Sequence, residues 1–152
     1  MTIRRIKNKE LFLNMLDLEV KRAKRYQDFF SILKFKLWPL PGSKNEDGLK
    51  TCWKILRDCL AEEFRESDIV SFLGNDQWAV IIPMANLSTA SLLRSRLMDC
   101  LEYHNFKKKG CAVRADLICF PTDGTSTADL IGKLKDQREH DHGERGESPG
   151  LD

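Results

Sequence analysis

The sequence has no long apolar run and no strong charge of one sign. No stretch approaches the roughly 20 apolar residues that a membrane helix needs, and the first ten residues lack the apolar core of a signal peptide. We therefore expect a cytoplasmic protein without a membrane span. The net charge of +2 is too small to indicate a nucleic-acid partner.

Cysteine pairs of the CxxC type are also missing. The five cysteines are odd in number, and most of them lie among apolar residues of predicted helices or strands. This placement predicts reduced thiols in the core. We expect no metal site, because we identify no histidine at zinc-ligand spacing from these cysteines.

What the sequence does contain is the apolar periodicity of one α+β domain. Its 152 residues fit a single domain, with 41% hydrophobic and 32% charged residues. The apolar residues follow the order α-β-α-β-β-α-β-α, which predicts a mixed, mostly antiparallel central sheet of about five strands flanked by helices. Helices are expected over residues 9–27, 49–64, 88–104 and 127–137, and strands over residues 29–38, 68–73, 77–83 and 111–120.

Three local features refine this prediction. Asn86 or Ser88 can cap the third helix, and Ser126 or Thr127 the fourth. In the first strand, alternating lysines and apolar residues after residue 33 predict a solvated face. The last residues, 138–152, are polar and are expected to be disordered.

The strands at residues 68–73 and 77–83 form a predicted β-hairpin. Gly74, Asn75 and Asp76 supply its turn, because glycine and asparagine both tolerate positive φ. The returning strand opens with Gln77 and Trp78.

This hairpin resembles the signature of GGDEF diguanylate cyclases, which carry Gly-Gly-Asp/Glu-Glu-Phe at this place. Upstream, Arg65 and Asp68 match the family's RxxD inhibitory motif at the family's spacing. Residues 8–26 resemble its opening helix, and residues 120–124 its Y-P-x-D-G turn. The resemblance covers residues 6–134. It implies the GGDEF, nucleotide cyclase-like fold over residues 1–137, in a bacterial second-messenger signalling protein.

The resemblance also implies that the cyclase chemistry is lost. The family joins two GTP molecules with the help of Mg²⁺, which prefers carboxylate oxygens. Where the family has carboxylates on its first strand, this chain has Lys36 and Trp38, and Gln77 replaces the hairpin glutamate. Asn75 replaces the second glycine, and Asp76 remains. We expect a degenerate active site with no catalytic residue, no bound metal and no required cofactor.

A site for cyclic di-GMP is what the resemblance implies is kept. Arginine can donate two hydrogen bonds to guanine O6 and N7, and a carboxylate can accept from its N1–H and N2–H. The ligand would therefore contact Arg65 and Asp68, which we treat as exposed. In the family a further arginine on the next helix completes the site. That position is Arg96 here, with Arg94 as the nearby substitute.

RxxD is a common pattern and also occurs at Arg25 and at Arg96 in this chain. The plain alternative is that Arg65 ends a helix and pairs with an acid on the surface. We expect a non-catalytic cyclic di-GMP receptor that forms a homodimer when the ligand binds and that acts on an unknown downstream protein. The alternatives are a dimerisation or protein-interaction module without a ligand, and a weak enzyme or GTP sensor.

Overall fold

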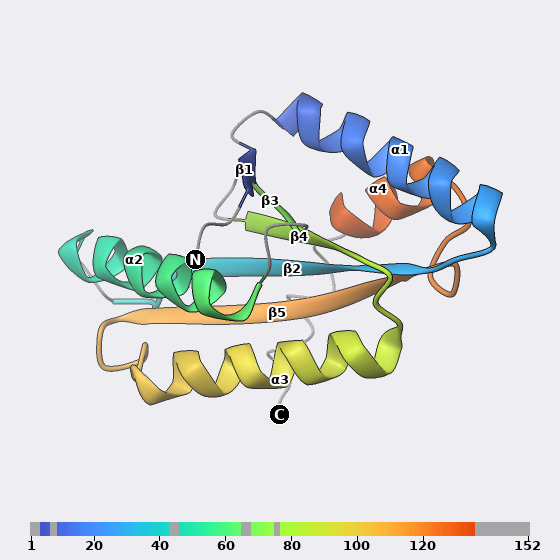
Figure 1. Cartoon of the computed structure of the whole chain (residues 1–152). Coiled ribbons are helices and arrows are strands. Elements are labelled where there is room, and N and C mark those ends of the chain that lie inside the picture. The colour runs from blue at the N-terminus through green and yellow to red at the C-terminus, as the bar shows by residue number, and fades with distance from the viewer. Residues whose placement is uncertain (1–3, 7–8, 43–45, 65–67, 75–76, 136–152) are drawn as a thin grey trace.

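The computed structural model describes residues 4–6, 9–42, 46–64, 68–74 and 77–135 (Figure 1). A sheet with the strand order β1-β3-β4-β2-β5 forms its centre. The strands are β1 (Arg4–Ile6), β2 (Phe30–Pro39), β3 (Ile69–Gly74), β4 (Gln77–Pro83) and β5 (Cys111–Phe120). The helices are α1 (Lys9–Tyr26), α2 (Glu46–Glu63), α3 (Leu87–Tyr103) and α4 (Thr127–Lys135).

The strand pairing confirms the predicted mixed, mostly antiparallel sheet. β1 runs parallel to its neighbour β3, and the other three pairs are antiparallel. The short basic strand β1 was not predicted, because three residues are too few for apolar alternation to show. The tail expected at residues 138–152 lies outside the described residues.

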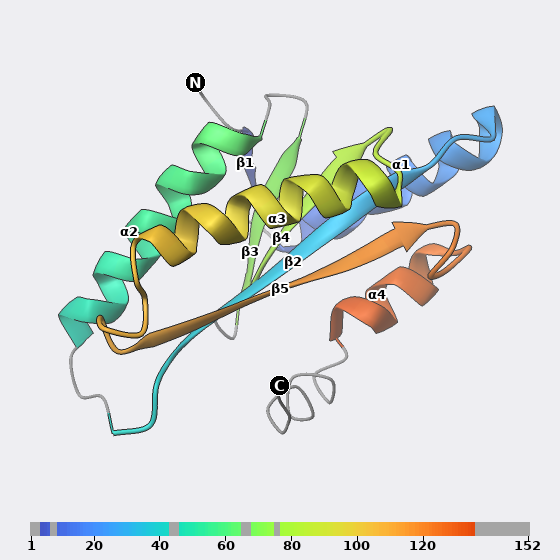
Figure 2. The same ribbon diagram turned by 90° about the horizontal axis from the view of Figure 1, so that it is seen from below.

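Helices cover both faces of the sheet (Figures 1 and 2). α2 and α3 pack on one face, where β2 contributes Leu33, Phe35 and Leu37. α1 and α4 pack on the other face, where β2 contributes Phe30 and Ile32. This alternation follows from the period of two along a strand. Burying each large apolar side chain stabilises the fold by roughly 1.5–3 kcal/mol, so both layers contribute substantially.

Local hydrogen bonds settle which residues cap the last two helices. The Thr89 N–H donates to Asn86 Oδ1 at 2.9 Å, so Asn86 caps α3. At α4 the Asp129 N–H donates to Ser126 Oγ at 3.1 Å. Asp129 Oδ2 in turn accepts the Thr125 N–H at 3.1 Å, and the bonds from Thr125 and Ser126 hold the pKa of the Asp129 carboxyl below its usual range. Each cap contributes about 1 kcal/mol.

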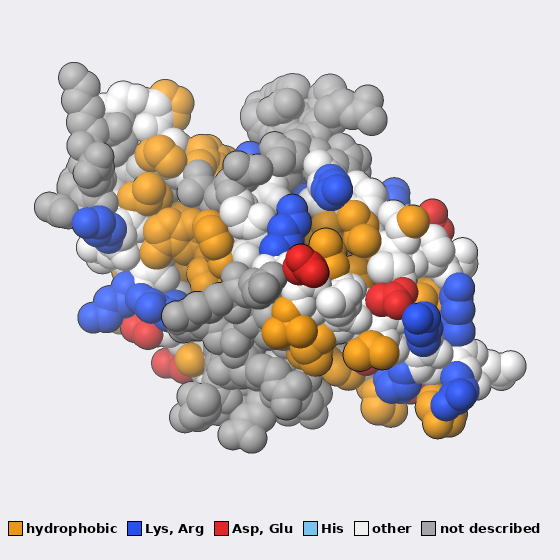
Figure 3. Space-filling view, turned by 90° about the horizontal axis from the view of Figure 1, so that it is seen from above, with side chains coloured by type: hydrophobic (Ala, Val, Ile, Leu, Met, Phe, Trp, Pro, Cys, Tyr) orange, Lys and Arg blue, Asp and Glu red, His pale blue; other side chains and the backbone are white. Residues whose placement is uncertain are grey.

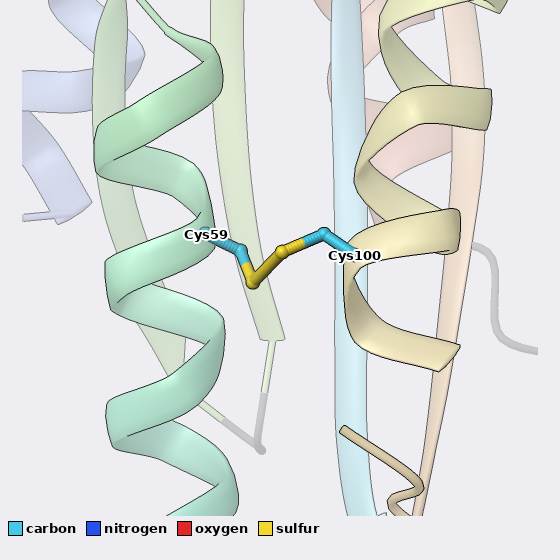
Figure 4. Close-up of a disulfide and its surroundings, with 2 residues drawn as sticks. All are labelled: Cys59 and Cys100. Atoms are coloured by element: carbon cyan, nitrogen blue, oxygen red, sulfur yellow. A yellow bond between two sulfur atoms is a disulfide. The ribbon is translucent and has the colours of Figure 1, made fainter. Parts of the chain in front are cut away.

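The prediction of five reduced thiols is wrong for two of the cysteines. A disulfide joins Cys59 of α2 to Cys100 of α3 (Figure 4). Cys52, Cys111 and Cys119 are free and buried. Sequence spacing did not indicate the pair, because it joins two helices that are 41 residues apart in the chain. No helix among the described residues is both long and apolar enough to cross a membrane.

Candidate functional site

The hairpin between β3 and β4 begins at a residue that needs glycine. Gly74 has φ +88°, a conformation that side chains rarely adopt, and it pairs across the turn with Gln77. The register shifts between Phe72 and Gly74, which marks a bulge beside the turn. Asn75 and Asp76 lie outside the described residues. The described part agrees with the predicted β-hairpin.

Among the described residues, the sheet face around Lys36 carries little negative charge. Lys36 pairs with Gln77 of β4 on one side and with Arg114 of β5 on the other, so the three side chains project from the same face. Its ammonium lies 5.9 Å from the centre of the Trp38 ring. The carboxylate of Asp116 on this face accepts from Arg114 Nε at 3.1 Å. A divalent cation placed here would meet repulsion from Lys36 and Arg114.

Lys34 is a buried residue on the same face, where the sequence predicted a solvated one. It is 3% exposed, and its ammonium donates to the carbonyl of Leu134 at 3.3 Å, in the last turn of α4. A cation is favoured there because the carbonyl ends of a helix carry partial negative charge. Lys34 therefore attaches α4 to the sheet.

A small cavity lies between α1, α4 and the hairpin. Gln77 lines it together with Leu13 of α1, Leu73 of β3 and Leu134 of α4. Gln77 is 5% exposed, and its side-chain nitrogen has no hydrogen-bond partner among the described residues. The cavity volume is about 80 Å³. Ligand pockets usually measure roughly 300–1,000 Å³, so this cavity can hold water but not a nucleotide.

The sequence-predicted ligand corner follows the end of α2. Arg65 lies outside the described residues, which continue on either side of it with Phe64 and Asp68. Phe64 is completely buried, and Asp68 is 2% exposed. The expectation that Asp68 is exposed is therefore wrong. Asp68 directly precedes the buried start of β3, and its side chain is buried together with that end of the strand.

The two arginines of α3 point to different neighbours. Arg96 Nε lies 3.3 Å from Glu63 Oε1, in an ion pair without hydrogen-bond geometry. Glu63 is the last residue of α2, two positions before Arg65. Arg94 Nε instead donates to the carbonyl of Ala115 on β5 at 2.8 Å. Arg96 thus lies against the end of α2, whereas Arg94 is bound to the sheet.

Comparison with known proteins rests on structure, because no family model and no curated protein matches the sequence. The GGDEF domain of FimX from Pseudomonas aeruginosa superposes with a TM-score of 0.74 at 16% identity, covering 97% of this chain and 93% of that one. An active GGEEF domain of a diguanylate cyclase from Vibrio cholerae gives 0.73 at 13% identity, covering 94% of both chains. This protein has the GGDEF fold.

A third match is diguanylate cyclase SiaD, solved in complex with its activator SiaC from Pseudomonas aeruginosa. Its TM-score is 0.70 at 14% identity, covering 93% of this chain and 56% of that one.

In the GGDEF fold of this protein, the predicted ligand corner and the hairpin lie at opposite ends of β3. Asp68 precedes that strand and Gly74 ends it. A six-residue strand spans roughly 20 Å, so a substitution in the hairpin does not directly contact the ligand corner.

Sequence reasoning missed one cluster of side chains with ligand chemistry. The ligand atoms of Cys59, Cys100 and His104 all lie within 4.8 Å of one another. Within the described ranges this is the one group of three or more such residues that could hold a metal ion. A signal was present, since Cys100 and His104 are four residues apart and so share one side of the chain at the end of α3.

Proposed function

We propose that the protein is a non-catalytic receptor for cyclic di-GMP. The ligand would bind at the corner formed by the end of α2, Arg65, Asp68 and Arg96 of α3. The observation that carries the proposal is the ion pair between Arg96 and Glu63, at 3.3 Å. It brings the third residue of the site to the end of the helix from which the RxxD segment continues.

The chemistry of the corner suits guanine. Arg96 is 59% exposed, so its guanidinium can exchange the carboxylate of Glu63 for the Hoogsteen edge of a base. Asp68 is buried, so ligand binding must uncover its carboxylate before it can accept from guanine N1–H and N2–H. This opening lowers the affinity by the free energy that it costs.

The sheet face at the hairpin supports the non-catalytic part of the proposal. A cyclase reaction needs Mg²⁺ held by carboxylates next to phosphate. Lys36 stands there between Gln77 and Arg114, and the Asp116 carboxylate on the same face already accepts from Arg114. Removing one group that stabilises the transition state electrostatically typically slows a reaction by a factor on the order of 10²–10³.

Purified protein incubated with GTP and either Mg²⁺ or Mn²⁺ should therefore make no cyclic di-GMP. The reaction is followed by chromatography of the nucleotides, with an active GGDEF cyclase as the positive control. Product that forms with the wild type and disappears with Asp76→Ala would show that the hairpin still catalyses, and it would overturn this part of the proposal.

Ligand binding itself is tested by calorimetric titration with cyclic di-GMP, using GTP as the control nucleotide. Heat with the dinucleotide and none with GTP supports the receptor. Heat with GTP alone supports a GTP sensor.

We further propose that the ligand promotes a homodimer. Two cyclic di-GMP molecules can stack into an intercalated pair, whose four guanines can be shared by two protein copies. Multi-angle light scattering should then show the molar mass doubling on saturation with cyclic di-GMP. A monomer at ligand saturation contradicts the dimer and leaves the binding site unaffected.

The second candidate function is a protein-interaction module without a nucleotide. Exposed apolar side chains of α1 favour it, namely Leu11, Leu18 and Tyr26. Figure 3 views the molecule from the side of α1 and α4 and shows hydrophobic side chains partly in groups and partly between charged ones. The absence of any heat with cyclic di-GMP in the titration would favour this function.

A further inference from the structure

The cluster of Cys59, Cys100 and His104 lies where α2 and α3 come together. Cys59 is buried, and the other two side chains are half-buried. Figure 4 shows the two cysteines reaching toward each other from adjacent helices. Their sulfurs are joined in a disulfide, so the oxidised protein has no free thiolate at this place.

Local contacts hold the third member of the cluster in position. His104 is the C-cap residue of α3, and its backbone N–H donates to Leu101 O at 3.2 Å. Lys109 Nζ donates to its carbonyl. The imidazole packs edge-on against Tyr103, with 5.3 Å between the ring centres. The backbone of His104 is thus fixed on the helix that also carries Cys100.

Two thiolates and an imidazole form a donor set that Zn²⁺ prefers. With Zn–S bonds of about 2.3 Å, two sulfurs on a tetrahedral ion are about 3.8 Å apart. Bonded sulfurs cannot both adopt that arrangement, so the disulfide and a bound ion exclude each other. The three ligand atoms are otherwise close enough to meet at one centre after modest side-chain rotation, since they lie within 4.8 Å of one another.

We propose that reduction of the disulfide between Cys59 and Cys100 creates, together with His104, a binding site for Zn²⁺. In the first step a dithiol reductant supplies two electrons and two protons, becomes a disulfide itself, and leaves two thiols. In the second step both thiols release their protons to solvent as two Zn–S bonds form. The neutral imidazole adds the third ligand, and water completes the tetrahedron.

The other buried cysteines provide an internal comparison. The pKa of the Cys52 thiol is raised to about 12, mainly by burial and also by the neighbouring Cys111. The thiol therefore stays protonated at neutral pH. Cys119 interacts with Ser31, whose hydroxyl lies 3.5 Å from its sulfur. Neither belongs to a described group with three possible metal ligands.

The site would connect redox state and metal supply to the contact between α2 and α3. Cys59 lies one turn before Glu63 on α2, and Cys100 lies one turn after Arg96 on α3. The disulfide or the ion would therefore hold the two helices together next to the ion pair of Glu63 and Arg96. The reduced, metal-free protein would lack this link.

Cobalt(II) titration tests the proposal, because thiolate-bound Co²⁺ absorbs in the near ultraviolet and tetrahedral Co²⁺ absorbs in the visible. The full chain is reduced with dithiothreitol, desalted without oxygen and titrated with Co²⁺. We expect both absorptions to saturate at one ion per chain and to disappear when Zn²⁺ is added. The oxidised protein should show neither absorption.

Substitutions then assign the ligands. Cys100→Ser should remove most of the thiolate absorption, and His104→Asn should weaken cobalt affinity by roughly tenfold or more. Cys119→Ser is the matched control and should titrate like the wild type. Circular dichroism verifies that each variant is folded. A reduced wild type without thiolate absorption, or an absorption that survives Cys100→Ser, would overturn the proposal whatever the variants do to folding.

Discussion

Replacing Arg65 with alanine should weaken cyclic di-GMP binding by roughly 5- to 150-fold, which corresponds to about 1–3 kcal/mol. The guanidinium is expected to donate to two acceptors of one guanine, and alanine leaves both without a partner. Asp68→Ala should have an effect in the same range, because it removes the acceptor for the Watson–Crick edge. Titration calorimetry measures both affinities against the wild type.

Because Asp68 is buried, its variants need a measurement of stability as well as one of affinity. A carboxylate that is 2% exposed can support the fold as well as the ligand, so Asp68→Ala can also lower stability. Asp68→Asn keeps the shape of the side chain while it removes the charge. Thermal unfolding of both variants separates the two roles, since a loss of affinity at unchanged stability identifies a ligand contact.

Variants of the two arginines of α3 test which of them contacts the ligand. Arg96→Ala should reduce affinity less than Arg65→Ala, because Arg96 must first leave Glu63 to contact the ligand. Arg94→Ala should leave affinity unchanged, since Arg94 donates to a carbonyl of β5. Equal losses for the Arg94 and Arg96 variants would contradict the assignment of Arg96 to the site.

Arg25 offers a control within an RxxD sequence at another place. The Asp28 carboxylate accepts from the Phe29 N–H at 2.8 Å and from Arg22 at 3.1 Å. These bonds hold the pKa of Asp28 below its usual range and commit its oxygens to neighbours on the chain. Arg25→Ala should therefore bind like the wild type. Wild-type affinity in the Arg65 and Asp68 variants would contradict the receptor and favour the interaction module.

The elements of the fold could be predicted because each of them has a local cause. Four helices and four strands follow from apolar periodicity, and the caps follow from Asn86 and Ser126. The two-layered core follows from alternation along β2, where Leu33 and Phe35 face α2 and α3 while Ile32 faces α1 and α4. The sequence already contains these patterns within windows of a few residues.

What could not be predicted depends on contacts between distant segments. Lys34 belongs to an alternating strand and was expected to be solvated, but the carbonyl end of α4 covers it. Asp68 belongs to a polar run, but β3 begins directly after it in the core. The disulfide joins helices that become neighbours only through the sheet. Period and spacing do not contain this information.

At the candidate site, the neighbours of the two arginines of α3 can be compared with the sequence pattern. The order of the motifs placed Arg96 near the end of α2, which agrees with its ion pair to Glu63. Helix geometry counts against the expectation that Arg94 can substitute for Arg96, since residues two positions apart project about 200° apart around the axis. Nothing in the spacing distinguished the arginine that points to α2 from the one that points to β5.

Substituting Phe64 with alanine should have the largest effect on stability among the changes near the corner. Phe64 is completely buried among α2, α3 and the sheet, and its N–H continues the helix by donating to Leu60 O at 3.0 Å. Removing such a ring leaves a cavity and costs about 3–5 kcal/mol. For a domain of this size each kcal/mol corresponds to about 2–4 °C, so the midpoint of thermal unfolding should fall by roughly 10 °C.

The same variant tests how the corner is held. Phe64 anchors the chain before Arg65, and buried Ile69 anchors it after Asp68. Without the first anchor, the variant should bind cyclic di-GMP more weakly even at temperatures at which circular dichroism shows it folded, because the site must be ordered before the guanines can bind. Phe29→Ala is the matched control, since that ring is 38% exposed and its loss should cost about 1 kcal/mol and no affinity. A folded Phe64→Ala protein with wild-type affinity would show that the corner does not depend on the end of α2.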